Sequence, residues 1–202
     1  RFFKTGRGEY GEGDRFLGIR VPVLRKMAKK NRDIHIHDAA RLLRTPFHEA
    51  RMFALLVLMD QFQKGDDDER HLIYQLYLDH TEYINNWDLV DVSAGHIIGA
   101  YLKERSRGVL YEMAASESIW ERRIAVIATF PYIKERDYED AIAIAEILIT
   151  DPHDLIQKAV GWMLREIGKQ DIHTEAAFLK RHYLSMPRTM LRYAIEKFPE
   201  DE

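Results

Sequence analysis

Residues 85–91 place an aromatic side chain and a carboxylate where both could act on one ligand. Asn86 is a favourable helix N-cap, which predicts that a helix begins at Trp87. Residues four apart lie on one side of a helix, so Trp87 and Asp91 would present an aromatic face and a negative charge together. The alternative is an ordinary helix start, in which the indole packs under a loop and Asp91 pairs with Arg123.

A second segment, residues 154–165, combines tryptophan with basic side chains in a similar way. Lys158, Trp162 and Arg165 follow one another at spacings of four and three residues, which places them on one side of a helix. Apolar residues recur at helical spacing on a different side, at Ile156, Val160, Met163 and Ile167. The side that carries Trp162 is therefore predicted to face away from the core.

The composition limits what kind of protein carries these segments. The chain has 202 residues, 46% of them hydrophobic, which is enough to bury a core as one domain over residues 1–202. It has no cysteine and no long apolar run, so we expect a cytoplasmic protein without disulfides, thiol nucleophiles or a membrane span. With a net charge of -3, binding to a polyanion requires basic residues sorted onto one surface. Because the sequence begins abruptly at Arg1, we expect that it lacks the native N-terminus.

Helix-start signals recur at a nearly constant interval along the chain. Capping side chains or a first-turn proline precede apolar-periodic runs at Thr45-Pro46, Asn86, Ser118, Asp151-Pro152 and Ser185. These starts lie 32 to 41 residues apart, which is typical of repeats made of two antiparallel helices. Second helices are predicted over 68–78, 138–149 and 174–183, and strand signals are nearly absent. The sequence therefore predicts an all-α solenoid of helix pairs.

Aligning the repeats by their caps brings charged residues to one equivalent position, five to seven residues after each cap. The position is occupied by Arg51, Asp91, Arg123, Lys158 and Arg192, with Arg122, Arg165 and Arg188 close by in sequence. Equivalent helices of a solenoid line one wall, so this row would form a stripe on a concave surface, and its basic members suit a phosphate backbone. Asp91 would repel phosphate, which indicates either a structural ion pair or a chemical role.

Three other features receive structural interpretations. Asp88 lies in the first turn of its predicted helix, where a carboxylate offsets the helix dipole. The acidic run at residues 66–69 is predicted to cap the next helix. His35 and His37 lack a third ligand at a recognisable spacing, so a surface role is favoured over a metal site.

At residues 16–22, 87–91, 119–125 and 156–166, the sequence resembles the AlkD-like family of DNA alkylation repair glycosylases, whose fold is a solenoid of HEAT-like repeats. The resemblance runs over most of the chain. It places the family's catalytic aspartate on Asp91 and three further functional residues on Trp87, Arg123 and Trp162. It also implies an aromatic residue near the first repeat, for which Tyr10 is the candidate.

The resemblance implies a glycosylase that excises cationic alkylated purines, such as 7-methylguanine and 3-methyladenine, from double-stranded DNA. It further implies that the lesion is processed without a base-specific cavity, and we expect a monomer that requires no metal or organic cofactor. An alkylated purine is already a good leaving group, so Asp91 would stabilise the cation that develops on the sugar. Trp87 and Trp162 would pack against the deoxyribose, and Arg123 would hold a phosphate. Further DNA contacts are expected from Arg51, Arg122, Lys158, Arg165, Arg188 and Arg192.

The alternative is a non-catalytic HEAT-repeat module that binds structured nucleic acid or a protein partner through the same surface. A pure binding module has no need of a carboxylate that faces phosphates, so the presence of Asp91 favours catalysis. A protein-binding module would instead present an apolar patch along that wall.

Overall fold

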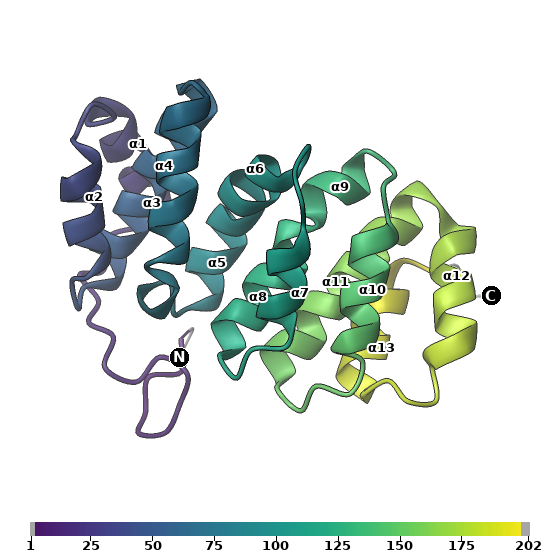
Figure 1. Ribbon diagram of the computed structural model, residues 1–202. Helices are drawn as coiled ribbons and strands as arrows, with labels where there is room; N and C mark the ends of the chain where they lie inside the picture. Colours follow the sequence, from purple (N-terminus) through teal and green to yellow (C-terminus); the bar gives the residue numbers. More distant parts are fainter. Residues whose placement is uncertain (1–2, 199–202) are drawn as a thin grey trace. The chain divides into compact units, whose positions relative to one another are not determined.

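The computed structural model describes residues 3–198, and this part of the chain is helical with no β-strand (Figure 1). The predicted all-α class is confirmed. An isolated parallel bridge joins Arg15 to Phe47. Within the described range, none of the helices is both long and apolar enough to cross a bilayer. The chain divides into two compact units, the first ending at Tyr101 and the second beginning at Leu102.

The first unit is organised around the long helix α3, His48–Lys64 (Figure 1). Apolar residues occur nearly all round α3, which is why helices can pack on several of its sides. These are α1 (Val21–Lys30), α2 (Ile36–Leu43), α4 (Asp67–Leu78) and α5 (Trp87–Ala94). A 3-10 turn at Thr81–Tyr83 precedes α5, and a π-helical turn at Gly95–Gly99 joins α5 to α6 (Ala100–Leu102).

The second unit is organised around α11, Asp154–Gln170. The helices that pack on α11 are α8 (Ile119–Ala128), α9 (Phe130–Lys134), α10 (Glu139–Ile147), α12 (Ile172–His182) and α13 (Arg188–Ala194). Helix α7 (Gly108–Ala114) packs on α8, and a 3-10 turn at Ile195–Lys197 follows α13. Gly161 allows α13 to approach closely, because a Cβ at this position would lie 2.6 Å from Cβ of Tyr193.

Neighbouring helices form pairs inside each unit, as the repeat spacing predicts. Helix α3 packs on α4, α7 on α8, and α11 on α12. The three predicted second helices correspond to α4, α10 and α12, and their ends agree to within two residues. The helix-pair repeats are thus confirmed within each unit, whereas the concave surface stays a prediction.

Three of the capping predictions are confirmed. The side chain of Asn86 accepts a hydrogen bond from N–H of Trp87, and the side chain of Ser118 accepts one from N–H of Glu121. In the acidic run, Asp66 and Glu69 form a capping box that begins α4. Polar side chains at these positions therefore fix where α4, α5 and α8 begin.

The other three predicted N-cap positions were each wrong by two residues. Helices α3, α11 and α13 begin at His48, Asp154 and Arg188, with Phe47, His153 and Pro187 as their N-cap residues. The predicted capping residues have other partners. The hydroxyls of Thr45 and Ser185 donate to the carbonyls of Leu42 and His182, and Asp151 accepts from N–H of His153. These three side chains form hydrogen bonds within the turn that precedes each helix. Each helix therefore begins after that turn, beyond the predicted capping residue.

Candidate active site

A hollow of about 720 Å³ lies in the first unit, and both Trp87 and Asp91 line it. Its walls come from α1, α3, α5 and the chain that precedes α1. Both side chains point to this hollow because they lie one turn apart at the beginning of α5. The hollow therefore offers an aromatic surface and a carboxylate to the same bound group.

Aromatic rings form one wall of this hollow. The rings of Phe3 and Phe16 stack with centroids 5.0 Å apart, and the Phe3 ring lies 5.7 Å from the ring of Trp87. Both phenylalanine rings also lie 4.9 Å from the imidazole of His48. Tyr10, the aromatic residue favoured by the sequence, does not line the hollow. The aromatic residue that the resemblance implies near the first repeat therefore fits Phe3 or Phe16 better than Tyr10.

The first turn of α5 is held by a buried asparagine. Asn86 is fully buried, and its side-chain oxygen accepts from N–H of Trp87 at 2.9 Å. Its Nδ2 donates to Oδ2 of Asp14 at 3.2 Å. Asp14 belongs to the chain before α1, so this hydrogen bond connects the N-terminal segment to the helix that carries Trp87 and Asp91.

His48 is a buried, charged bridge between two carboxylates. Its Nδ1 lies 3.3 Å from Oδ2 of Asp14, and its Nε2 lies 2.8 Å from Oδ2 of Asp88. Burial alone would lower the pKa of His48, but the hydrogen bonds and charges of the two carboxylates outweigh it and raise the pKa to about 9. At neutral pH the His48 ring is therefore an imidazolium that donates hydrogen bonds to both carboxylates.

Asp88 has a further role beyond that predicted from its position. It lies in the first turn of α5, as expected for a carboxylate that offsets the helix dipole. Its Oδ1 accepts from N–H of Leu89 at 2.9 Å, while its Oδ2 meets His48. Asp88 therefore also joins the start of α5 to the start of α3.

Arg51 is not a surface residue. It is 3% exposed, and its guanidinium donates to the carboxylate of Asp14, the side-chain oxygen of Asn85 and the carbonyl of Tyr83. The prediction that Arg51 lies in an exposed charged stripe is therefore wrong, and its contact with DNA stays a prediction. The reason is that Arg51 lies one turn after His48 on α3, so both side chains reach the same buried carboxylate.

Glu49 anchors the turn in front of α1 through hydrogen bonds from the backbone. Its carboxylate accepts from N–H of Leu17, Gly18 and Ile19 at 2.9, 2.7 and 3.2 Å. Burial raises the pKa of Glu49, but these hydrogen bonds outweigh it, so the net pKa lies below the ordinary value. Gly18 adopts φ of 77°, a conformation that favours glycine. This anchor fixes the segment that carries Phe16 over the hollow.

The two proposed functional residues of the second unit differ in burial: Arg123 is buried and Trp162 is half-buried. Arg123 is 5% exposed and donates to the carbonyl of Leu155. Trp162 is half-buried; its Nε1 donates to Glu166 at 2.9 Å and its ring lies 6.0 Å from that of Phe130. The indole of Trp162 is thus accessible at the surface of α11, as its predicted position on the helix requires.

The predicted DNA-contacting cations of the second unit differ in exposure. Arg188 and Arg192 are exposed. Lys158 is partly exposed and pairs with Asp154 at 2.7 Å. The guanidinium of Arg122 pairs with Asp151 at 2.8 Å, and that of Arg165 pairs with Glu196. Among residues 3–198, no ion pair joins Arg188 or Arg192 to a carboxylate, whereas the other three cations already have acidic neighbours.

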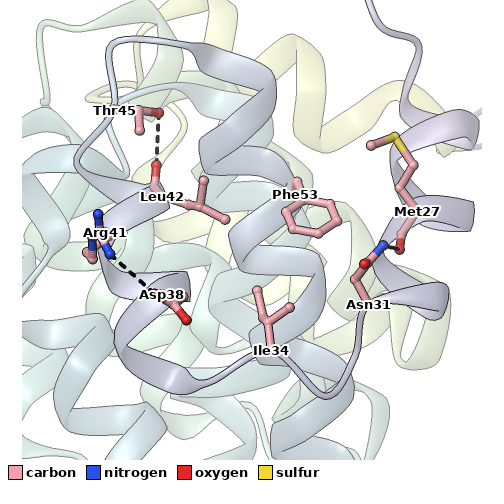
Figure 2. Close-up of a pocket in the computed structure, with 8 residues that line it drawn as sticks. All are labelled: Met27, Asn31, Ile34, Asp38, Arg41, Leu42, Thr45 and Phe53. Carbon is pink, nitrogen blue, oxygen red and sulfur yellow. Dashed lines mark hydrogen bonds and ion pairs between the residues drawn. The ribbon is translucent and has the colours of Figure 1, made fainter.

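Another hollow, of about 530 Å³, lies among α1, α2 and α3 (Figure 2). Its polar side chains are engaged close by. Asn31 donates to the carbonyl of Met27, Thr45 donates to that of Leu42, and Arg41 pairs with Asp38 at 3.5 Å (Figure 2). Asp38 and Phe53 also line this hollow, but the carboxylate of Asp38 is already paired with Arg41, so this hollow is the weaker candidate.

No group of three or more histidine, aspartate or glutamate side chains within residues 3–198 is arranged to hold a metal ion. His35 has a structural role, because its Nδ1 accepts from N–H of His37 and caps α2.

The site residues that sequence reasoning missed come from distant parts of the chain. His48 meets partners 34 residues before it and 40 residues after it. No local spacing of residues in the sequence predicts a bridge between such distant partners. Phe16 stands within a segment that the sequence singled out, but its place on the wall of the hollow depends on the anchor at Glu49.

Comparison with known proteins identifies the family. A family model described as DNA alkylation repair enzyme matches residues 1–198. The chain belongs to this family. No curated protein gives a significant match.

Solved structures share the fold of this family member. One is described as a predicted DNA alkylation repair enzyme from Enterococcus faecalis; it is 16% identical with a TM-score of 0.74, over 95% of this chain and 92% of that chain. AlkD2 from Streptococcus mutans is 17% identical with a TM-score of 0.65, over 91% of this chain and 92% of that chain. At these identities the likeness shows the fold, so the chemistry of this DNA alkylation repair family member is argued from its own residues.

Proposed function

We propose that this protein is a DNA glycosylase that hydrolyses the N-glycosidic bond of cationic alkylated purines, such as 7-methylguanine and 3-methyladenine, in double-stranded DNA. The observation that carries the proposal is the shared hollow of Trp87 and Asp91, with Phe3 and Phe16 on the same wall. Aromatic rings beside a carboxylate fit a group that carries or develops positive charge.

The chemistry requires little acid catalysis. An alkylated purine carries positive charge, so it leaves as a neutral base when the bond to C1′ of the deoxyribose breaks. Positive charge then develops on the sugar, and a water molecule adds to C1′ and loses a proton. The carboxylate of Asp91 stabilises the sugar cation more strongly in the transition state than in the ground state, and it can accept the proton of the water. Trp87 packs against the sugar.

The residues of the second unit complete the proposal. We assign Trp162 to the deoxyribose and Arg123 to a phosphate of the damaged strand, because the resemblance places family functional residues there. Arg188 and Arg192 supply exposed positive charge for the DNA backbone. The protein acts as a monomer without a metal or organic cofactor.

The test is release of free base from methylated duplex DNA. Purified protein is incubated with duplex that contains 7-methylguanine or 3-methyladenine, and released bases are measured by chromatography. Protein inactivated by heat and undamaged duplex give the background, because cationic purines also leave spontaneously. Release above both controls is expected, and release at the background rate would contradict the proposal.

A second candidate function is a non-catalytic module that binds a protein partner. The observation that favours it is a group of exposed apolar side chains beside the hollow. These are Phe16, Leu17, Val21 and Val23, which are 40%, 54%, 38% and 47% exposed. Under this alternative, methylated DNA would be neither cleaved nor bound more tightly than undamaged DNA.

A further inference from the structure

We infer that His48 is the positioning residue of the Trp87 and Asp91 site, acting as an imidazolium that holds the first turn of α5 against α3. This inference deepens the proposed function and rests on it for the catalytic consequence. His48 itself lines the hollow, but its two ring nitrogens are occupied by Asp14 and Asp88.

The geometry requires the charged form of the ring. A neutral imidazole donates from one nitrogen and carries a lone pair on the other. Here both nitrogens face carboxylate oxygens, at 3.3 Å to Asp14 and 2.8 Å to Asp88. Loss of the proton would therefore turn one of the two hydrogen bonds into a contact between a lone pair and a carboxylate. The side chain of His48 is 4% exposed, so water has little access to relieve that contact.

Each partner of His48 connects to the residues of the site. Asp88 directly follows Trp87 and lies in the turn that leads to Asp91. Asp14 also accepts from Asn86, whose side-chain oxygen caps the helix at Trp87. Two separate paths thus lead from the imidazolium to the beginning of α5. Losing the bridge would free the turn that sets where the indole and the carboxylate point.

Other charged groups of the hollow and of the His48 network come from every element that walls the hollow. From α3 come Arg51, which pairs with Asp14, and Glu49, which is anchored to the turn before α1. From α5 comes Asp91, and from α1 and the residue before it come Arg20 and Arg25. Asp14 and Asp88 are the partners in direct contact with the ring, so the protonation of His48 is set mainly by them.

The first experiment reads the position of Trp87 without requiring activity. A protein whose remaining tryptophan is Trp87 is made by Trp120→Phe and Trp162→Phe, and its emission is recorded between pH 7 and pH 10.5. We expect a change in emission with a midpoint near pH 9. His48→Gln in this background should abolish the transition, because glutamine does not titrate. His37→Gln, at an exposed histidine of the same unit, should leave the transition unchanged.

Asp88→Asn is the second variant, and it keeps the inference testable if His48→Gln fails to fold. Asparagine retains an oxygen acceptor but removes a negative charge, so the midpoint should fall by about one pH unit or more. A transition that survives in His48→Gln, a midpoint unmoved by Asp88→Asn, or the absence of any transition in the parent protein would each overturn the inference.

The second experiment links the bridge to base release. Single-turnover release of 3-methyladenine should fall as pH rises through about 9, and His48→Gln should lower the rate at pH 7 by about tenfold or more, because small misplacements of catalytic groups are costly. Its remaining rate should be independent of pH in this range. If the unaltered protein releases base but His48→Gln has the same rate and pH profile, the inference fails and the proposed function stands. If no base is released, the proposed function fails while the emission titration still tests the bridge.

Discussion

Nε2 of His48 lies 2.8 Å from Oδ2 of Asp88, which ties the first residue of α3 to the first turn of α5. Asp88 is the neighbour of Trp87, and Asp91 lies less than one turn further on. The orientation of the Trp87 and Asp91 pair therefore depends on a histidine that the local sequence around the pair does not contain.

The His48 bridge predicts how stability changes with pH. The pKa of His48 is about 9 in the folded protein and 6.5 in its ordinary environment, so its contribution is fully present below pH 6.5 and is lost as pH rises through 9. The stability difference between the unaltered protein and His48→Gln should therefore shrink between pH 6 and pH 10 by about 1 to 3 kcal/mol. Thermal melts of both proteins across this range provide the measurement. A difference that stays constant with pH would show that the folded protein does not hold the proton.

Asp91→Asn separates the catalytic role of Asp91 from the structural alternative. If the charge of Asp91 stabilises the sugar cation, the variant should keep its melting temperature and DNA affinity, while base release falls by roughly ten- to a thousand-fold. Some release remains, because the leaving group is already activated. Single-turnover release is measured beside a melting curve, with Asp33→Asn at an exposed aspartate as control. An unchanged rate in a stable variant would contradict the role assigned to Asp91, and joint loss of stability and affinity would favour an ion pair.

Exposed and buried arginines should respond differently in DNA binding. Each phosphate contact contributes about -0.9 to the slope of log affinity against log salt concentration. Arg188→Ala and Arg192→Ala should each reduce the magnitude of the slope by about one and leave the melting temperature unchanged, because both side chains are exposed. Arg51→Ala should lower the melting temperature, because it leaves Asp14 buried without its guanidinium partner. Titrations of undamaged duplex across salt concentrations give the slopes. If neither substitution changes the slope, Arg188 and Arg192 do not contact DNA phosphates.

Gly161→Ala should destabilise the second unit. A Cβ at this position would lie 2.6 Å from Cβ of Tyr193 and would also crowd the carbonyl oxygen of Met190, so α13 must move away from α11. Overpacking of this kind typically costs about 1 to 3 kcal/mol. Gly108→Ala is the matched control, because the nearest atom there is Oγ of Ser106 at 3.7 Å. Denaturant melts of the two variants check the prediction, which fails if both glycines tolerate alanine equally.

Local patterns in the sequence determined the all-α class and the side-by-side placement of Trp87 and Asp91. Helical periodicity and capping act over a few residues, so they can be read without knowing what packs against the helix. Asn86, Ser118 and the acidic run at residues 66–69 all begin helices where predicted. Gly161 lies in the segment 156–166 that carries the family resemblance, but the reason for glycine there is the close approach of Tyr193 in the folded chain.

Tertiary packing decided which charged residues are available to a ligand. Arg51 occupies the repeat position predicted to face DNA, yet it is buried against Asp14, 37 residues earlier in the chain. His48 carries no motif, yet it joins carboxylates from two distant segments. Repeat spacing fixes the side of a helix on which a residue lies, but burial and charge pairing depend on which segments fold against that side. That is why the sequence located Trp87 and Asp91, whereas the buried network that holds them is a property of the folded chain.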